Sequence, residues 1–329
     1  MTTNLAGEDK LIVLVPVFND WEAVSLLLPA LDRELIANGL NADVIVVDDA
    51  SLMPAPSTLA QAPFSGITSV DILVLRRNLG HQRAIAVGLA FIEANRPCRA
   101  VVVMDGDGED EPADVPRLVR ECEAGKNNKV IFAERTRRSE SLAFRIFYHL
   151  YRVIHLILTG VRVRAGNFSV VPAAALQRLV VVSDLWNHYA AGVYKSQLPI
   201  GLLPTRRGKR LTGRSQMNLV ALVVHGLSAM AVFGDRIGVR LLIAVGVAIV
   251  LMGGLLLTVI GIRLLTPLAI PGWATYTTGL LVLMLAQMLL VALVFAFVIL
   301  AARDTASVLP NRDYIHFVSR VERVYARGD

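Results

Sequence analysis

Two uncharged apolar runs near the end of the chain place the strongest constraint on its fold. Residues 241–262 carry no charged side chain across 22 positions, and residues 279–302 carry none across 24. A helix needs about 20 apolar residues to cross the hydrocarbon core of a bilayer. The sequence therefore predicts a transmembrane hairpin of two helices, in preference to two buried helices of a soluble core.

The arginines around this hairpin predict its orientation. Arg236 and Arg240 precede the first run, and the loop between the runs carries only Arg263. Five arginines follow the second run: Arg303, Arg312, Arg320, Arg323 and Arg327. Positive residues near membrane helices stay on the cytosolic side, and the polar N-terminus does not resemble a signal peptide. We therefore expect an integral inner or plasma membrane protein with two spans, whose N-terminal region and C-terminus are both cytosolic.

The composition of the whole chain indicates which classes of partner it could bind. The net charge is +6, the isoelectric point is about 9.6 and the mean hydropathy is +0.55. A basic balance suits an anionic membrane surface or phosphate ligands, whereas no nucleic-acid-binding module is visible. Cys98 and Cys122 form no metal-binding or redox motif, so we expect free buried thiols in a reducing compartment.

The first 135 residues alternate between apolar strand patterns and helix patterns. Expected strands cover residues 10–17, 43–47, 70–75, 101–104 and 129–133, and expected helices cover residues 20–38, 84–94 and 112–124. A further strand is expected later in the chain, near residues 168–171. Such alternation is typical of an α/β fold with a doubly wound, mainly parallel sheet. The carboxyl ends of the strands should therefore share one edge, where ligands of such sheets bind.

An acidic turn directly follows the fourth of these strands. Residues 101–110 read VVVMDGDGED, which delivers Asp105, Asp107 and Glu109 to the sheet edge, with Gly106 between the first two. Hard divalent ions prefer oxygen ligands and are commonly held by one or two carboxylates plus substrate phosphates. The turn therefore predicts a site for a metal and a diphosphate. The alternative is an ordinary solvated acidic turn.

Two amphipathic segments and a basic loop follow the fifth strand. Residues 141–159 carry Arg145, His149 and Arg152 near one helical face, which is typical of an interfacial helix. The alternative is an ordinary core helix with one solvent-exposed face. Residues 217–234 form a second amphipathic segment, and residues 206–215 form the basic loop.

The strand ends together resemble the inverting glycosyltransferases of family 2, which have the GT-A fold. Residues 16–20 (PVFND) resemble the segment that begins that family's nucleotide pocket, residues 48–51 match its D-D-x-S, and residues 77–80 match its R-N-x-G. Residues 105–110 resemble its D-A-D-L-Q-D, and residues 210–216 its R-x-x-G-x-S-K. The resemblance covers roughly residues 10–235. With the hairpin and the amphipathic helices, it narrows to the polyprenyl-phosphate glycosyltransferases, which include dolichyl-phosphate mannose synthase and the bactoprenol glucosyltransferases.

This resemblance implies a role for each matching residue. The nucleotide-sugar would contact Pro16, Phe18, Asn19, Asp20, Asp48, Asp49, Ser51, Asn78, Gly80, Asp105 and Gly106. Mg²⁺ or Mn²⁺ would be held by Asp105, Asp107 and Glu109. The acceptor phosphate would contact Arg135, Arg145, Arg210 and Ser215. The catalytic set would be Asp107, Arg135 and Arg145, although headgroup binding alone is an equal alternative for Arg145 and the basic loop.

The resemblance also implies domains and a reaction. Residues 1–140 would be the nucleotide-sugar-binding core, 141–235 the acceptor side with its amphipathic helices, 236–303 the hairpin and 304–329 a basic cytosolic tail. The reaction would move a sugar from a UDP- or GDP-linked donor to a polyprenyl phosphate with inversion. A family 2 transferase with another acceptor and a non-catalytic nucleotide-sugar binder are the alternatives. The hairpin also suits self-association.

Four residues between the matched motifs, Trp186, Asn187, His188 and Tyr189, fit a sugar or acceptor pocket, or the packing of a small subdomain. We favour packing. His81 follows the R-N-x-G match and fits either a helix cap or a nucleotide contact. We favour the structural role for it as well.

Overall fold

The computed structural model describes residues 10–57, 59, 63–135, 153–161, 165–212, 219–266, 272–304 and 308–327. The chain forms two compact units. The first comprises Met1–Tyr148, Arg162–Val232 and Ser307–Asp329, and the second comprises His149–Val161 and Phe233–Ala306.

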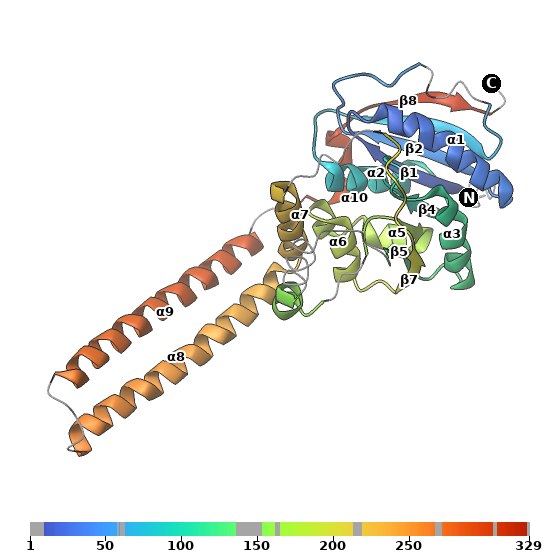
Figure 1. Cartoon of the computed structure of the whole chain (residues 1–329). Coiled ribbons are helices and arrows are strands. Elements are labelled where there is room, and N and C mark those ends of the chain that lie inside the picture. Colours follow the sequence, from blue (N-terminus) through green and yellow to red (C-terminus); the bar gives the residue numbers. More distant parts are fainter. Residues whose placement is uncertain are drawn as a thin grey trace, which may run out of the picture. The chain divides into compact units, whose positions relative to one another are not determined.

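The first unit is built around an eight-stranded sheet in the order β7-β5-β6-β4-β1-β2-β3-β8 (Figure 1). The strands are β1 (Leu11–Val17), β2 (Ala42–Asp48), β3 (Ile67–Leu75), β4 (Ala100–Val103), β5 (Val130–Arg135), β6 (Ser169–Pro172), β7 (Ile200–Thr205) and β8 (Val318–Ala326). Strand β1 runs parallel to β2 and β4, β2 runs parallel to β3, and β5 runs parallel to β7. Strand β6 is antiparallel to both β4 and β5, and β8 is antiparallel to β3. The expected mainly parallel α/β sheet is confirmed.

Helices cover both faces of this sheet. The helices of the first unit are α1 (Trp21–Ala37), α2 (His81–Asn95), α3 (Val115–Ala124), α5 (Ala173–Leu179), α6 (Tyr189–Lys195), α7 (Leu219–Ala231) and α10 (Pro310–Asp313), with short 3₁₀ turns η1 (Pro112–Asp114), η2 (Ser183–Trp186) and η3 (Tyr314–His316). The central strand β1 shows how the two layers arise. Ile12 and Leu14 join the core beneath α2, whereas Leu11, Val13 and Val15 join the core beneath α1 and α3. Successive strand residues face opposite sides, so an unbroken apolar strand fills two cores at once.

Two strands of this sheet were not expected from the sequence. Residues 304–329 were expected to be a basic tail, but residues 318–326 form β8 at the edge of the sheet. Its anchor is Asp71 on β3, which is 3% exposed and accepts hydrogen bonds from Arg323 on β8 and from Arg96. Most of β8 is exposed and three of its nine residues are charged, so its sequence lacks the apolar run that identifies a buried strand. Strand β7 at the opposite edge was missed as well.

The two cysteines lie in the core of the first unit as free thiols, as expected. Burial raises the pKa of Cys98 to about 12 and that of Cys122 to about 11. Both side chains should therefore stay protonated and unreactive at neutral pH.

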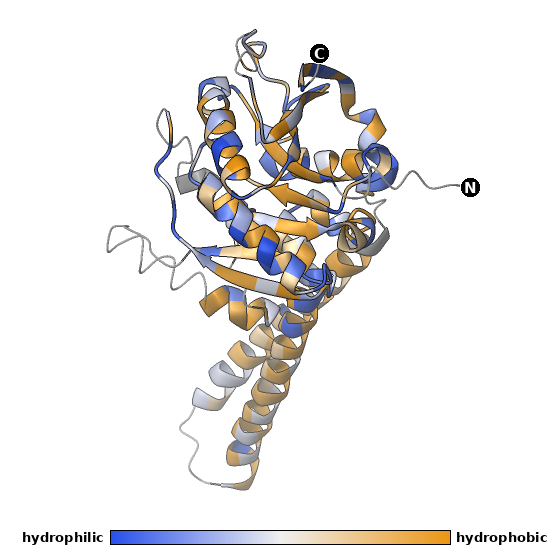
Figure 2. Cartoon of the chain, turned by 90° about the vertical axis from the view of Figure 1, so that its right-hand side faces the viewer, coloured by the Kyte–Doolittle hydropathy of each residue, from blue (hydrophilic) through white to orange (hydrophobic). Residues whose placement is uncertain are grey.

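The second unit contains an antiparallel pair of long helices, α8 (Gly234–Leu265) and α9 (Trp273–Asp304). Val259 packs with Ala274 and Leu281 near the turn, and a Cβ on Gly238 would lie 2.5 Å from Ile299 at the other end. Both helices are long and apolar enough to cross a membrane. In the most apolar 18-residue stretch of each helix, 6% of the residues of α8 and 0% of those of α9 are buried. Figure 2 shows the hydrophobic colouring along both helices. The two expected spans, 241–262 and 279–302, lie inside these helices.

The first amphipathic segment is described only in part. Residues 153–159 are helical, whereas Arg145, His149 and Arg152 lie outside the described residues. The second segment, expected over residues 217–234, contains α7.

Candidate active site

The acidic turn after β4 folds back on itself beside the carboxyl end of β1. The Asp110 carboxylate accepts the Asp105 N–H at 2.9 Å, and the Asp107 carboxylate accepts the Glu109 N–H at 2.9 Å. A Cβ on Gly106 would lie 3.1 Å from a methyl group of Val15. A glycine is therefore needed for the turn to approach β1 this closely.

The basic loop after β7 lies directly against this acidic turn. The Gly208 N–H donates to the Glu109 carbonyl at 2.9 Å, and the Leu211 N–H donates to the Asp107 carbonyl at 2.9 Å. Gly108 has a φ of +84°, and a Cβ on Gly208 would lie 2.5 Å from the Gly108 carbonyl oxygen. Two segments about 100 residues apart in sequence are thus joined by backbone hydrogen bonds as well as by charge.

Two arginines of the basic loop pair with the carboxylates of the site. Arg210 donates from Nη1 to Asp107 at 3.0 Å and from Nη2 to Asp20 at 2.5 Å. Arg207 donates two hydrogen bonds to Glu109, at 3.0 and 2.5 Å. Arg210 therefore bridges acids that follow two different strands, and three residues expected at the site from sequence meet at one guanidinium. The pairing of Arg207 with Glu109 was missed, although opposite charges in two facing segments could have suggested it.

A second group of expected residues forms the loops after β1 and β2. The Ser51 hydroxyl accepts the Asn19 N–H at 2.9 Å, and the Asn19 side chain accepts the Leu52 N–H at 2.7 Å. Asp48 accepts the Ser51 N–H at 2.8 Å. Asn19 has a φ of +55°, a conformation that asparagine tolerates better than most residues. These bonds fix the loop that follows β2 against the one that follows β1.

Asp49 holds the neighbouring turn instead of facing solvent. The residue is 2% exposed, and its two carboxylate oxygens accept the N–H groups of Leu79 and Gly80 at 2.7 and 2.8 Å. Burial raises the pKa of this carboxyl, although the two backbone hydrogen bonds oppose the shift. Asp49 thereby orients the turn that contains Asn78.

His81, at the start of α2, lies against the acidic turn. Its Nε2 is 3.0 Å from Asp105 Oδ1 and 2.9 Å from Asn167 Nδ2. Burial disfavours the charged imidazole, but the carboxylates of Asp105, Asp110 and Asp107 together outweigh this effect and raise the pKa of His81. The histidine is therefore part of the charge network of the site, in addition to beginning a helix.

The four residues of the small subdomain mainly pack, as favoured from sequence. Tyr189 is fully buried, and its hydroxyl lies 2.6 Å from the Ser169 hydroxyl. Trp186 stacks near Phe317, with ring centroids 4.8 Å apart. His188 immediately precedes α6 and accepts the Ala191 N–H on its Nδ1.

A pair of histidines links the start of α6 to the amphipathic helix α7. His188 Nε2 lies 3.2 Å from His225 Nε2. Because His188 Nδ1 is an acceptor, its neutral form carries the proton on Nε2 and donates it to His225. Burial lowers the pKa of His225, and the nearby His81 lowers it further. Protonation of His225 would replace this acceptor with a donor and break the bond.

This histidine pair predicts a pH-dependent stability of the first unit. Because the folded pKa of His225 lies below its unfolded value, the contribution is present above about pH 6.5 and is lost as the pH falls. We expect the melting temperature to fall further between pH 7.5 and pH 5.5 in the wild type than in His225→Gln. The exposed His316 provides the matched control, His316→Gln, which should keep the wild-type slope. Equal slopes for all three proteins would contradict this assignment.

The negative charge of the carboxylates at the site is only partly balanced by nearby cationic side chains. Burial raises the pKa of Asp107, and repulsion from Asp105 and Glu109 adds to this shift while Arg210 opposes it. Carboxylate oxygens that repel one another fit a hard divalent cation. Among the described residues, no three acidic, histidine or cysteine side chains converge as a complete ligand set. A cation here would therefore need oxygens from a phosphate ligand in addition to the protein carboxylates.

Comparison with known proteins decides the family. Residues 12–180 match the family described as "Glycosyl transferase family 2". This chain belongs to that family. The match covers the strand ends of β1, β2, β3 and β4, which carry the carboxylates described above, and extends through α5.

Several curated proteins that are similar to this chain are described as the same kind of enzyme. The chain is 29% identical over 148 residues to the undecaprenyl-phosphate 4-deoxy-4-formamido-L-arabinose transferase of Erwinia tasmaniensis, in a match that covers 43% of each chain. It is 25% identical over 220 residues to the enzyme of that description from Edwardsiella ictaluri, in a match that covers 64% of each chain. The chain thus spans less than two thirds of the length of these relatives.

The fold is also found among solved structures. Glucosyl-3-phosphoglycerate synthase from Mycobacterium tuberculosis, in complex with Mn²⁺, uridine diphosphate and phosphoglyceric acid, aligns with a TM-score of 0.50 at 14% identity. The alignment covers 70% of this chain and 79% of that one. This likeness supports the GT-A-type mixed sheet of the present family 2 glycosyltransferase.

The site roles assigned from sequence remain predictions in this transferase, and the side chains of three of these residues are not described. Arg145 and Ser215 lie outside the described residues, and Arg135 ends β5 with a side chain that is also outside the described part. Phe18 follows β1 and is 43% exposed, which leaves its ring accessible to a ligand. Pro16 lies within β1 itself.

Proposed function

We propose that this family 2 glycosyltransferase transfers a sugar from a nucleotide-sugar donor to a polyprenyl phosphate at the cytosolic face of a membrane, with inversion and with Mg²⁺ or Mn²⁺. The observation that carries the proposal is the meeting of Asp20, Asp107 and Arg210 at one sheet edge. The edge offers carboxylates for a cation and arginines for phosphate groups within one cluster. The relatives named above are described as undecaprenyl-phosphate transferases.

The donor would bind along the ends of β1, β2 and β4. Asn19, Asp48 and Ser51 shape the loops that would receive the nucleoside, and Asp49 fixes the adjoining turn. Asp107 and Asp105 would hold the divalent cation, which neutralises charge on the leaving diphosphate when bound. Arg210 can turn from Asp107 toward phosphate oxygens, because a guanidinium fork matches a phosphate as well as a carboxylate.

The acceptor would be a phosphate that is already anionic, so it needs orientation more than deprotonation. Arg210 and the expected contacts Arg135, Arg145 and Ser215 would provide that orientation. A single in-line displacement at the anomeric carbon inverts its configuration. The long apolar helices α8 and α9 have the length and composition to retain the enzyme where a lipid acceptor resides.

A test supplies the full-length protein, in detergent, with radiolabelled UDP- and GDP-sugars, undecaprenyl phosphate and Mn²⁺. We expect label to move into the organic phase with one donor, only when the lipid phosphate is present, and to stay aqueous with excess chelator. Transfer to a water-soluble acceptor at an equal rate would instead support a family 2 transferase with another acceptor. Donor binding without any transfer would support the non-catalytic binder.

A further inference from the structure

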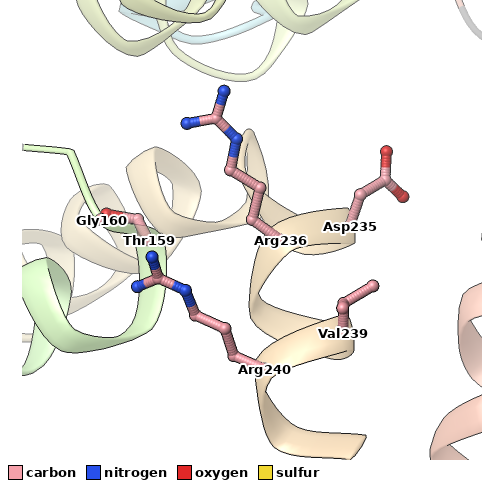
Figure 3. Close-up of a pocket in the computed structure, with 6 residues that line it drawn as sticks. All are labelled: Thr159, Gly160, Asp235, Arg236, Val239 and Arg240. Atoms are coloured by element: carbon pink, nitrogen blue, oxygen red, sulfur yellow. The ribbon is translucent and has the colours of Figure 1, made fainter. Parts of the chain in front are cut away.

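An open cavity whose lining includes two arginines lies entirely within the second unit, far along the chain from the acidic turn. It occupies about 460 Å³ between the end of the helical segment 153–159 and the start of α8 (Figure 3). Its lining residues are Thr159, Gly160, Asp235, Arg236, Val239 and Arg240. The volume is many times the ~30 Å³ share of one water in the liquid, so the cavity can admit a chemical group of several atoms.

Arg240 is fixed in this cavity by the backbone around it. Its Nη1 donates to the Ile157 carbonyl at 2.5 Å, which satisfies a carbonyl at the end of the preceding helical segment. Gly160 has a φ of +73°, and a Cβ there would lie 2.5 Å from Arg240 Nη2. A glycine at this position therefore lets the guanidinium approach. Figure 3 shows the guanidinium directed toward Thr159 and Gly160.

Arg236 adds a second positive charge one helical turn earlier. Its guanidinium lies 5.8 Å from the ring centroid of Phe233. Like charges four residues apart on a helix repel each other, and in the part of the chain that the structure describes neither arginine forms an ion pair. Figure 3 shows the Asp235 carboxylate on the side of α8 away from Arg240. A shared anion would relieve this repulsion.

An apolar stripe continues along α8 from the cavity. Val239 lines the cavity and is 49% exposed, and Ile243 and Val247 follow at four-residue spacing with exposures of 61% and 55%. Side chains four residues apart lie on one helical face. A ligand with a charged head and apolar chains would therefore meet both parts of this surface, whereas free phosphate would use only the arginines.

We propose that this cavity binds the phosphate headgroup of an anionic membrane phospholipid, whose acyl chains lie along the exposed apolar face of α8. Arg236 and Arg240 contact the phosphate oxygens with their guanidinium forks, which suit this geometry. The location at the start of a helix that is long and apolar enough to cross a bilayer matches the headgroup level. This site is additional to the proposed sugar transfer and does not depend on it.

The test measures lipid binding and not activity. The full-length protein is purified in a neutral detergent and titrated with phosphatidylglycerol, and bound lipid is counted by native mass spectrometry. We expect Arg236→Gln/Arg240→Gln to weaken phosphatidylglycerol binding by about tenfold or more, since the double variant removes both guanidinium contacts to the phosphate. The matched control, Arg263→Gln at the other end of α8, should change binding less than about twofold on the same scale.

Two further arms distinguish phospholipid binding from binding of free phosphate and from a loss of folding. Arg236→Gln alone leaves the Arg240 contact with the Ile157 carbonyl intact, so it should weaken binding without lowering the melting temperature. Bound phosphatidylglycerol should also persist in excess inorganic phosphate. The proposal is wrong if the double variant binds like the wild type, if Arg263→Gln weakens binding equally, or if inorganic phosphate displaces the lipid.

Discussion

Replacing Asp107 with asparagine should lower kcat/KM for sugar transfer by about 100- to 1,000-fold, the cost typical of removing one group that stabilises developing charge at a reaction centre. Asp107 is the carboxylate at which the turn after β4 and the basic loop meet, through its hydrogen bonds with Arg210 and with the Glu109 N–H. Asparagine keeps the size of the side chain and one acceptor oxygen but removes the charge. The measurement is the transfer of labelled sugar into the organic phase at varied donor concentration.

The matched control for this variant is Glu123→Gln. Glu123 lies on α3 and pairs with Arg99, outside the cluster around Arg210, so neutralising it should leave kcat/KM within about twofold of the wild type. Melting temperatures of both variants should stay near that of the wild type. The metal assignment for Asp107 would be untenable if Asp107→Asn retained more than about a tenth of wild-type activity while Glu123→Gln remained fully active.

Replacing Asp32 with alanine should destabilise the first unit by about 3–5 kcal/mol, since it leaves several backbone donors without an acceptor. Asp32 lies on α1, is 7% exposed, and accepts the N–H groups of Ser65, Gly66 and Ile67 at distances from 2.7 to 3.2 Å. Those residues lead into β3. For a unit of this size, such a loss should lower the melting temperature on the order of 10 °C.

Two variants control for this effect. Asp32→Asn retains one acceptor oxygen and should lose clearly less stability than the alanine variant. Glu34→Ala, at a partly exposed position of the same helix, removes a carboxylate without removing an acceptor for the buried loop and should leave the melting temperature nearly unchanged. If Asp32→Ala melted within about 2 °C of the wild type, the Asp32 carboxylate would not be holding the start of β3.

Much of the first unit could be predicted because its strands are buried on both faces. An apolar run such as residues 11–17 is typical of a parallel strand that is covered by helices on both faces of its sheet. The location of the candidate site could be predicted as well, because carboxylates and glycines that come after neighbouring parallel strands lie at the same edge of the sheet. Asp107 was assigned in this way and Asp20 from the family resemblance, and the structure brings both to Arg210.

The parts that could not be predicted depend on contacts between distant segments. Nothing local in residues 318–326 indicates a strand, because its pairing with β3 and the contact of Arg323 with Asp71 provide the stabilisation. The burial of Asp49 was equally hidden. The D-D-x-S match suggested a ligand contact for both of its acids, but only the fold reveals that one of them holds the turn at Leu79 and Gly80.

The pairing of β8 with β3 has a consequence for how the enzyme is made. More than 240 residues separate the two partners, and both long apolar helices lie between them in the sequence. During synthesis, β3 must therefore keep an open row of backbone donors and acceptors until both long helices and β8 have been translated. Unpaired strand edges invite association with other chains, so a nascent domain of this kind would benefit from rapid completion of the chain or from a chaperone that shields β3.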